Sequence, residues 1–156
     1  MGSTIRFDIE EKPGTWFPFQ TSTVKPDGEV EFDPPEPDAP EFCIRQANAE
    51  FFKSLHKKTR PAERKTVWHP KTHQPYTAPV EQTQEQREQE VEAIWDHTIT
   101  DWRGVLDKDG KEIPCTKKTK IQLLDRVPAV HRFYQHCLKI LGEESGVLRQ
   151  EENENL

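Results

Sequence analysis

A short proline-rich segment divides the chain and limits what it can fold into. Residues 33–40 read Asp-Pro-Pro-Glu-Pro-Asp-Ala-Pro, with four prolines and three acids. Proline lacks the backbone N–H that helices and inner strands use, so this segment can form neither. We predict an extended acidic linker over residues 34–40. Such a segment acts either as a plain spacer or as a docking segment for a basic partner.

The region before the linker has the pattern of short strands. Its apolar residues alternate with charged ones: Ile5, Phe7 and Ile9, then Val30 and Phe32. A period of two is typical of strands with one apolar face. An irregular aromatic strand at 16–19 lies between two turn signals, at 12–14 and 26–28. We therefore predict that residues 1–33 form an antiparallel β-meander.

The region after the linker has mainly helical periodicity, and we predict one domain over residues 41–142. Helical spacing of apolar residues marks four segments: 41–58, 81–103, 116–127 and 128–141. The clearest stripe consists of Val130, Phe133, Tyr134, Cys137, Leu138 and Leu141. A hairpin is expected near 66–78 and a turn at 105–113. Thr116 is a suitable N-cap, and Gly142 a suitable C-terminal cap.

The predicted fold class is α+β, with a β-meander, a central hairpin and a C-terminal helical subdomain. Residues 143–156 are rich in acids and are predicted to be a disordered tail. Hydrophobic and charged residues each make up 32% of the chain, and the mean hydropathy is −0.94. Only part of the chain can therefore bury a core, which we place in residues 85–142.

Charge and cysteine content limit the classes of function. The net charge of −6 argues against nonspecific nucleic-acid binding, which depends on neutralising phosphates with Lys and Arg. Cys43, Cys115 and Cys137 are scattered and odd in number, which suits reduced thiols in a cytoplasm. No apolar run reaches the roughly 18–20 residues of a membrane span. We expect a soluble protein in the cytoplasm of its host, without membrane contact.

The candidate chemical motifs fail on their own requirements. His69 and His73 have metal-ligand spacing, but Pro70 between them argues against a shared helix face. The glycine of 107–110 aligns with a calcium loop only if Val105 and Thr116 take ligand positions, which they cannot. Residues 54–57 match S-x-x-K without its partner motifs. Cys137 is predicted to be core, and Cys115 has no activating base. We predict no enzyme, no cofactor, and no catalytic, cofactor-binding or metal residue.

A basic stretch at residues 53–65 is the best nucleic-acid candidate. It carries six positive charges and one acid, with Trp68 nearby for stacking: Lys53, Lys57, Lys58, Arg60, Arg64 and Lys65, against Glu63. The alternative is a solvated helix end whose cations complement the helix dipole. The acidic linker is a further possible partner for this stretch within the chain.

Residues 94–116, IWDHTITDWRGVLDKDGKEIPCT, carry a distinctive pattern. Trp95, Asp96, Ile99, Asp101, Trp102 and Gly104 fit W-D-x-x-I-x-D-W-x-G, followed by D-x-x-G and I-P-C-T. This pattern resembles small proteins of siphophage and prophage tail modules, and the resemblance covers roughly residues 65–142. It implies a bacteriophage tail assembly chaperone, which coats the long, helical, hydrophobic tape measure protein until the tail tube polymerises. Members tend to self-associate, so a homo-oligomer is possible.

Two other functions stay open beside the chaperone. One is a nucleic-acid-associated phage protein using segment 53–65, although the acidic total makes nucleic acid an unlikely partner. The other is a structural tail completion or connector component. Trp95, Trp102 and Phe133 are predicted to be core, so the sequence identifies no partner-binding residue.

Overall fold

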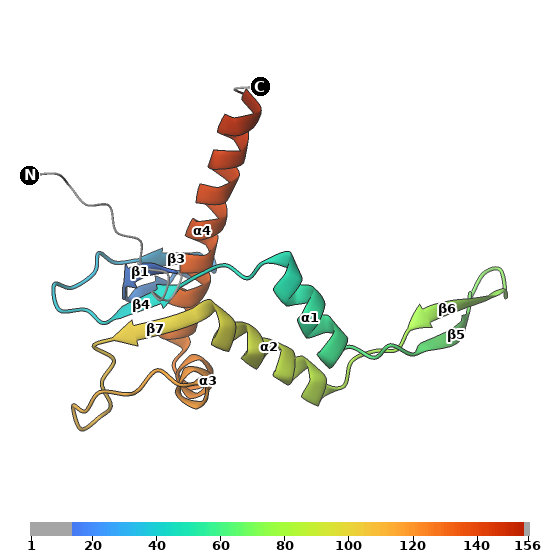
Figure 1. Ribbon diagram of the computed structural model, residues 1–156, viewed down its shortest axis with the longest axis horizontal. Coiled ribbons are helices and arrows are strands. Elements are labelled where there is room, and N and C mark those ends of the chain that lie inside the picture. Colours follow the sequence, from blue (N-terminus) through green and yellow to red (C-terminus); the bar gives the residue numbers. More distant parts are fainter. Residues whose placement is uncertain (1–13, 155–156) are drawn as a thin grey trace, which may run out of the picture. The chain divides into compact units, whose positions relative to one another are not determined.

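The computed structural model describes residues 14–154, with side chains to residue 144. The chain falls into two compact units, each considered by itself. Among the described residues, unit 1 contains those up to Gln46 and from Thr98 onward, and unit 2 is Ala47–His97. Across residues 14–154, four helices and three small antiparallel sheets confirm the α+β class (Figure 1).

Unit 1 is built around a three-stranded antiparallel sheet. Its strand order is β1 (Thr15–Pro18), β4 (Glu41–Ile44) and β7 (Ile99–Arg103). The central strand, β4, pairs with both neighbours. Three consecutive residues of β4, Phe42 to Ile44, are at most 2% exposed, so both faces of this strand are covered.

The β4 strand corrects the prediction of a helix over 41–58. A strand buried on both faces reads as a continuous apolar run, which periodicity alone cannot separate from a buried helix segment. The helix itself, α1 (Ala49–Thr59), begins after Asn48, whose side chain accepts a hydrogen bond from the Phe51 N–H.

The N-terminal strands pair differently from a meander. β1 pairs with β4, far along the chain, whereas β2 (Ser22–Val24) and β3 (Val30–Phe32) form a separate hairpin. The turn predicted at 26–28 closes that hairpin, because the Gly28 N–H donates to the Lys25 carbonyl. The strand expected at residues 5–9 lies outside the described residues.

The proline-rich segment has no helix or strand, as predicted. It joins β3 to β4, and both strands belong to unit 1. The Phe19 N–H donates to the Pro40 carbonyl at 2.8 Å and fastens the end of the segment beside β1. The proline-rich segment is therefore the loop between β3 and β4 in unit 1.

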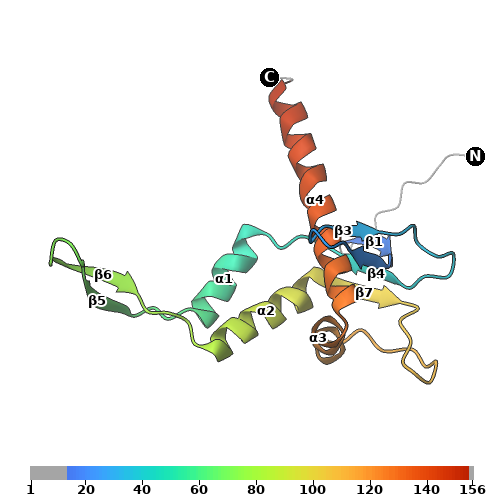
Figure 2. The ribbon, with the colours of Figure 1, turned by 180° about the vertical axis from the view of Figure 1, so that it is seen from behind.

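Helices α3 (Lys117–Arg126) and α4 (Pro128–Glu154) complete unit 1. Thr116 caps α3 in a reciprocal capping box with Thr119, and Pro128 occupies the first position of α4. The predicted stripe of α4 supplies much of the core, since Phe133, Tyr134 and Cys137 are buried. Figure 2 shows α4 crossing the region of β1 and β4.

Gly142 does not end helix α4. The helix continues to Glu154, so the segment predicted as a disordered tail is helical as far as that residue. Gly142 has no positive φ, the conformation that gives glycine its value as a helix cap. Gly142 therefore does not act as a cap, and helix α4 continues past it.

The predicted helix over 81–103 is divided in the structure. Helix α2 (Gln84–Thr98) ends where the β-branched run Thr98, Ile99 and Thr100 begins, and strand β7 follows directly. Ile99 and Trp102 were expected on a helix face. They are buried from the strand instead, since pairing with β4 outweighs helix propensity. The turn predicted at 105–113 is present, closed by a bridge between Leu106 and Glu112.

Unit 2 contains α1, the hairpin of β5 (Arg64–Trp68) and β6 (Pro75–Pro79), and α2 as far as His97. The hairpin confirms the prediction near 66–78. A capping box begins α2, because Thr83 and Gln86 each accept a hydrogen bond from the other's backbone N–H. Leu55 is the one buried hydrophobic residue in this unit.

Candidate binding surfaces

Residues 99–116, the larger part of the distinctive pattern, make two contacts that organise unit 1. The indole Nε1–H of Trp102 donates to the Ile113 carbonyl at 2.7 Å, which ties β7 to the end of the turn at 105–113. The carboxylate of Asp107 accepts from the N–H groups of Asp109 and Lys111, at 2.8 and 3.0 Å. That carboxylate therefore closes the turn at 107–110, where the sequence analysis rejected a calcium loop.

Two of the three aromatic residues predicted to be core are confirmed as core. Trp102 and Phe133 are 6% and 1% exposed, and both pack against Phe42. Trp95 is half-buried. The tryptophans of the pattern W-D-x-x-I-x-D-W-x-G are thus packing residues, and they do not form an exposed binding surface.

An open groove runs along helix α1 in unit 2. It has a volume of about 740 Å³, and its lining is mainly apolar. Ala49, Phe52, Pro61 and Ala62 supply the apolar part, while the rim is basic: Lys53, His56, Lys57 and Arg60. Helical spacing places residues 49, 52, 53, 56 and 57 on one side of α1, and Arg60 follows as its C-cap. This arrangement produces an apolar floor with basic side chains along it.

Glu90 of α2 fixes one side of this groove. Its carboxylate lies 3.2 Å from His56 Nε2 and 3.3 Å from Arg60 Nε, and its side chain is only 14% exposed. Gln82 also donates to Glu90 and to the Thr59 carbonyl. A carboxylate with several donors around it holds α1 and α2 together at their facing ends.

The predicted basic segment 53–65 is not one continuous surface. Residues 53–59 lie on α1, and Arg64 and Lys65 begin strand β5. Arg60 is engaged by Glu90, whereas Lys57 and Lys58 are exposed. The interpretation as a solvated helix end fits the last turn of α1, in which basic residues meet the carboxyl end of the helix.

A second hollow, of about 530 Å³, lies between strand β3 and helix α4 in unit 1. Phe32 stacks on the His136 ring with centroids 4.0 Å apart. Arg132 donates from Nε to the Ser22 hydroxyl, which anchors the β2–β3 hairpin to the helix. The contacts are those of packing between a hairpin and a helix.

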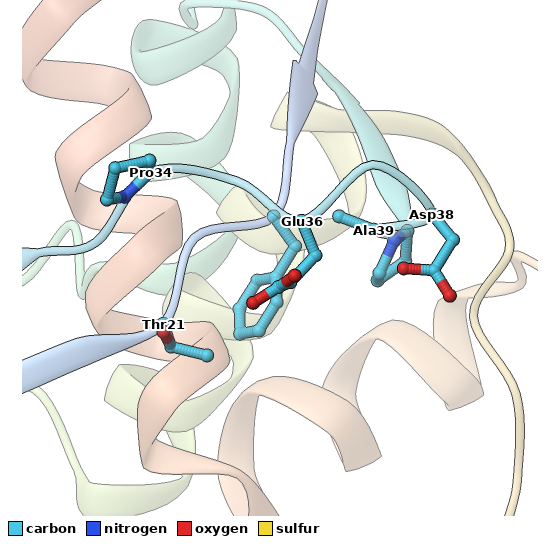
Figure 3. A pocket seen from close by; sticks show the side chains of 7 residues that line it. Thr21, Pro34, Glu36, Asp38 and Ala39 are labelled. Carbon is cyan, nitrogen blue, oxygen red and sulfur yellow. The ribbon is translucent and has the colours of Figure 1, made fainter.

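A third hollow, of about 250 Å³, lies under the proline-rich loop (Figure 3). Thr21, Pro34, Glu36 and Asp38 surround it with Phe19, Ala39 and Pro40. The Thr21 hydroxyl donates to the Asp33 carboxylate at 2.9 Å, which helps to set the loop. Its two exposed acids give it a charge opposite to that of the α1 groove.

The remaining candidates from the sequence are spread through the molecule. His69 and His73 are exposed on the turn of the β5–β6 hairpin, and Ser54 is exposed on α1. The thiols of Cys43 and Cys137 are buried and that of Cys115 is half-buried, and burial raises the pKa of Cys137 to about 12. Across the described residues, no group of three His, Cys, Asp or Glu side chains could hold a metal ion. Within residues 14–154, no helix combines the length and apolarity needed to cross a bilayer.

Comparison with known proteins assigns the family. Residues 46–140 match the model of the YdaY prophage protein family, which is more than half of the chain. The chain belongs to this family. No curated protein and no solved structure matches it.

The YdaY family segment contains the whole of unit 2, and then β7, α3 and the first half of α4. The α1 groove and the β5–β6 hairpin both lie within it, whereas β1 to β4 lie outside. The family match therefore confirms that the chain is a prophage protein, as the resemblance in the sequence predicted. Tyr76 lies in the predicted hairpin, but only the structure shows that its ring and that of Trp68 are exposed.

Proposed function

We propose that this YdaY-family protein acts by binding another phage protein, as a tail assembly chaperone. In this role it keeps the tape measure protein soluble before the tail tube polymerises. The observation that carries the proposal is the α1 groove, with its apolar floor and basic rim. The resemblance of residues 94–116 to proteins of tail modules supports the choice of client.

The groove suits a helical client. An amphipathic helix binds by laying its apolar face into a hydrophobic groove. Phe52 and Pro61 would contact that face, while Lys53 and Lys57 would meet acidic side chains at its margin. A long hydrophobic helical protein presents many such faces, so several chaperone copies can cover one client.

The rest of the proposed function follows from this binding role. The protein works in the cytoplasm of the bacterial host, without a catalytic step or a cofactor. Self-association is expected, because a coat on a long client brings neighbouring copies together. Sedimentation of the purified protein alone measures that association.

Co-expression with the tape measure protein of the same prophage tests the proposal. We expect stoichiometric co-purification and a soluble tape measure protein. A tape measure protein that stays insoluble and unbound at equal expression contradicts the chaperone role. A structural tail component would instead be retained in purified virions, from which a chaperone is absent.

Variants locate the surface. Phe52→Asp places a charge on the groove floor, and Lys57→Glu reverses an exposed rim charge without touching the interior. Both should reduce the yield of soluble tape measure protein. Val24→Asp, at a residue of β2 that is 54% exposed, is the matched control outside the groove. Loss with the control but not with the groove variants removes the groove from the proposal.

A further inference from the structure

The β5–β6 hairpin of unit 2 presents both faces to solvent. Five residue pairs join its strands, from Arg64 opposite Pro79 to Trp68 opposite Pro75. Within the two strands, only Val67 and Ala78 are half-buried, and the others are exposed. An isolated two-stranded hairpin is at best marginally stable in water. Folding stability therefore does not explain why this hairpin exposes two large aromatic side chains to solvent.

Each face of the hairpin combines one aromatic ring with one cation. Trp68 is 64% exposed and shares its face with Arg64, because alternate residues of a strand point the same way. Tyr76, 48% exposed, lies opposite Val67 on the other face, which also carries Lys65. Arg64 is held in place by hydrogen bonds from its guanidinium to Thr77.

Charge is strongly segregated toward this part of the chain. Residues 51–80 hold seven of the 22 Lys and Arg residues but only one of the 28 acids, Glu63. Residues 64–80 contain no acid at all, and add two histidines to Arg64, Lys65 and Lys71. Although the net charge of the chain is −6, the hairpin is cationic, and its charge is complementary to that of a polyanion.

The tip of the hairpin is shaped by its own hydrogen bonds. The His69 N–H donates to the Gln74 carbonyl, and the His73 N–H donates back to the His69 carbonyl, both at 3.0 Å. His73 takes a left-handed conformation with φ of 54°. These contacts leave Pro70 and Lys71 exposed at the end of the ribbon. Prolines serve as apolar wedges between base steps in several DNA-binding proteins.

We propose that the β5–β6 hairpin binds nucleic acid. Trp68 and Tyr76 contact base faces, while Lys65 and Lys71 contact phosphates. Aromatic rings beside cations are the means by which proteins hold exposed bases. A two-stranded ribbon also fits the major groove of a duplex. This inference goes beyond the chaperone function, and it moves the nucleic-acid surface from segment 53–65 to residues 64–76.

Fluorescence anisotropy with labelled oligonucleotides tests the inference on the full chain. A single-stranded and a duplex oligonucleotide are compared at 50 and 200 mM salt. With the two phosphate contacts of Lys65 and Lys71, we expect affinity for duplex to fall roughly 12-fold between these concentrations. Preference for the single strand indicates stacking on exposed bases, and preference for the duplex indicates binding in a groove; either supports the proposal.

Charge-reversal and aromatic variants locate the contact. Lys65→Glu with Lys71→Glu should abolish the salt-dependent binding, and Trp68→Ala should weaken it about 5-fold or more. Lys117→Glu with Lys118→Glu, at exposed positions of α3, is the matched control. All of these side chains are exposed, so circular dichroism should show unchanged folding.

Two results would overturn the inference. One is the absence of binding to either oligonucleotide at the lower salt concentration. The other is an equal loss in the hairpin and α3 variants. If the hairpin variants instead release the tape measure protein while oligonucleotide binding is absent, the hairpin binds an acidic protein surface. Retained solubilisation of that protein by the hairpin variants keeps the two functions separate.

Discussion

The two units differ most in what they bury. Of the twelve buried hydrophobic side chains among residues 14–144, eleven belong to unit 1, and Leu55 alone belongs to unit 2. Unit 1 packs helices and strands from distant parts of the chain around Phe42 and Phe133. Stability is therefore concentrated in unit 1, because the hydrophobic contribution grows with the apolar area removed from water.

Unit 2 is organised by polar contacts instead. Glu90 gathers His56, Arg60 and Gln82, and Phe51 stacks on His97 with centroids 3.8 Å apart. Such contacts set geometry but contribute less stability than a packed core. Unit 1 therefore supplies most of the packed core, whereas unit 2 presents apolar and cationic side chains to solvent.

Removing a buried aromatic ring should destabilise the protein far more than removing an exposed one. Phe133→Ala removes a ring that is 1% exposed, and should lower the free energy of unfolding by about 3–5 kcal/mol. Trp68→Ala removes a larger ring that is 64% exposed, and should change it by less than about 0.5 kcal/mol. Chemical denaturation measures both. Similar losses would mean that the hairpin ring is packed in solution, and the contrast between the units would fail.

An intermediate effect concerns the Trp102 hydrogen bond. Trp102→Phe keeps an aromatic ring but leaves the Ile113 carbonyl without its donor. A lost partner for a largely buried polar group costs about 1–3 kcal/mol of unfolding free energy. Trp68→Phe is the matched control, since it makes the same exchange on an exposed site. Equal stability of the two variants would show that the bond between β7 and residue 113 contributes nothing.

The smallest effect is seen in thiol chemistry. Cys115 is half-exposed, whereas Cys43 and Cys137 are at most 1% exposed, so native protein should react with a thiol reagent at Cys115 first. Unfolding should make all three available. Mass spectrometry of the labelled chain counts them. Rapid labelling of Cys137 in native protein would show that α4 opens.

Burial of Cys137 also gives unit 1 a pH dependence. Its pKa rises from 9.0 to about 12, so between these values the unfolded chain has lost a proton that the folded chain keeps. The unfolded state then binds fewer protons, and stability falls as pH rises through this window. Burial raises the pKa of Tyr134 as well, which acts in the same direction. A Cys137→Ala variant should show a smaller decrease between pH 8 and pH 10.

Local sequence signals determined several elements by themselves. Thr116 and Pro128 were placed correctly at the starts of α3 and α4, because caps and first-turn prolines act on the nearest backbone groups. The hairpin of β5 and β6 and the turn at 105–113 were also predicted, since both are closed by neighbouring residues. The stripe of α4 gave Phe133 and Cys137 as core.

Pairing between segments far apart in the sequence depends on tertiary packing, and local periodicity does not predict it. Residues 41–44 and 99–103 read as helical, yet each is a strand because the other is there to pair with it. The α1 groove likewise needs Glu90 from α2 to position its rim. Local periodicity reports which residues prefer burial, but pairing depends on segments separated by many residues. The sequence by itself therefore determined the helices, turns and charge pattern, whereas packing decided the central sheet and the surfaces available for binding.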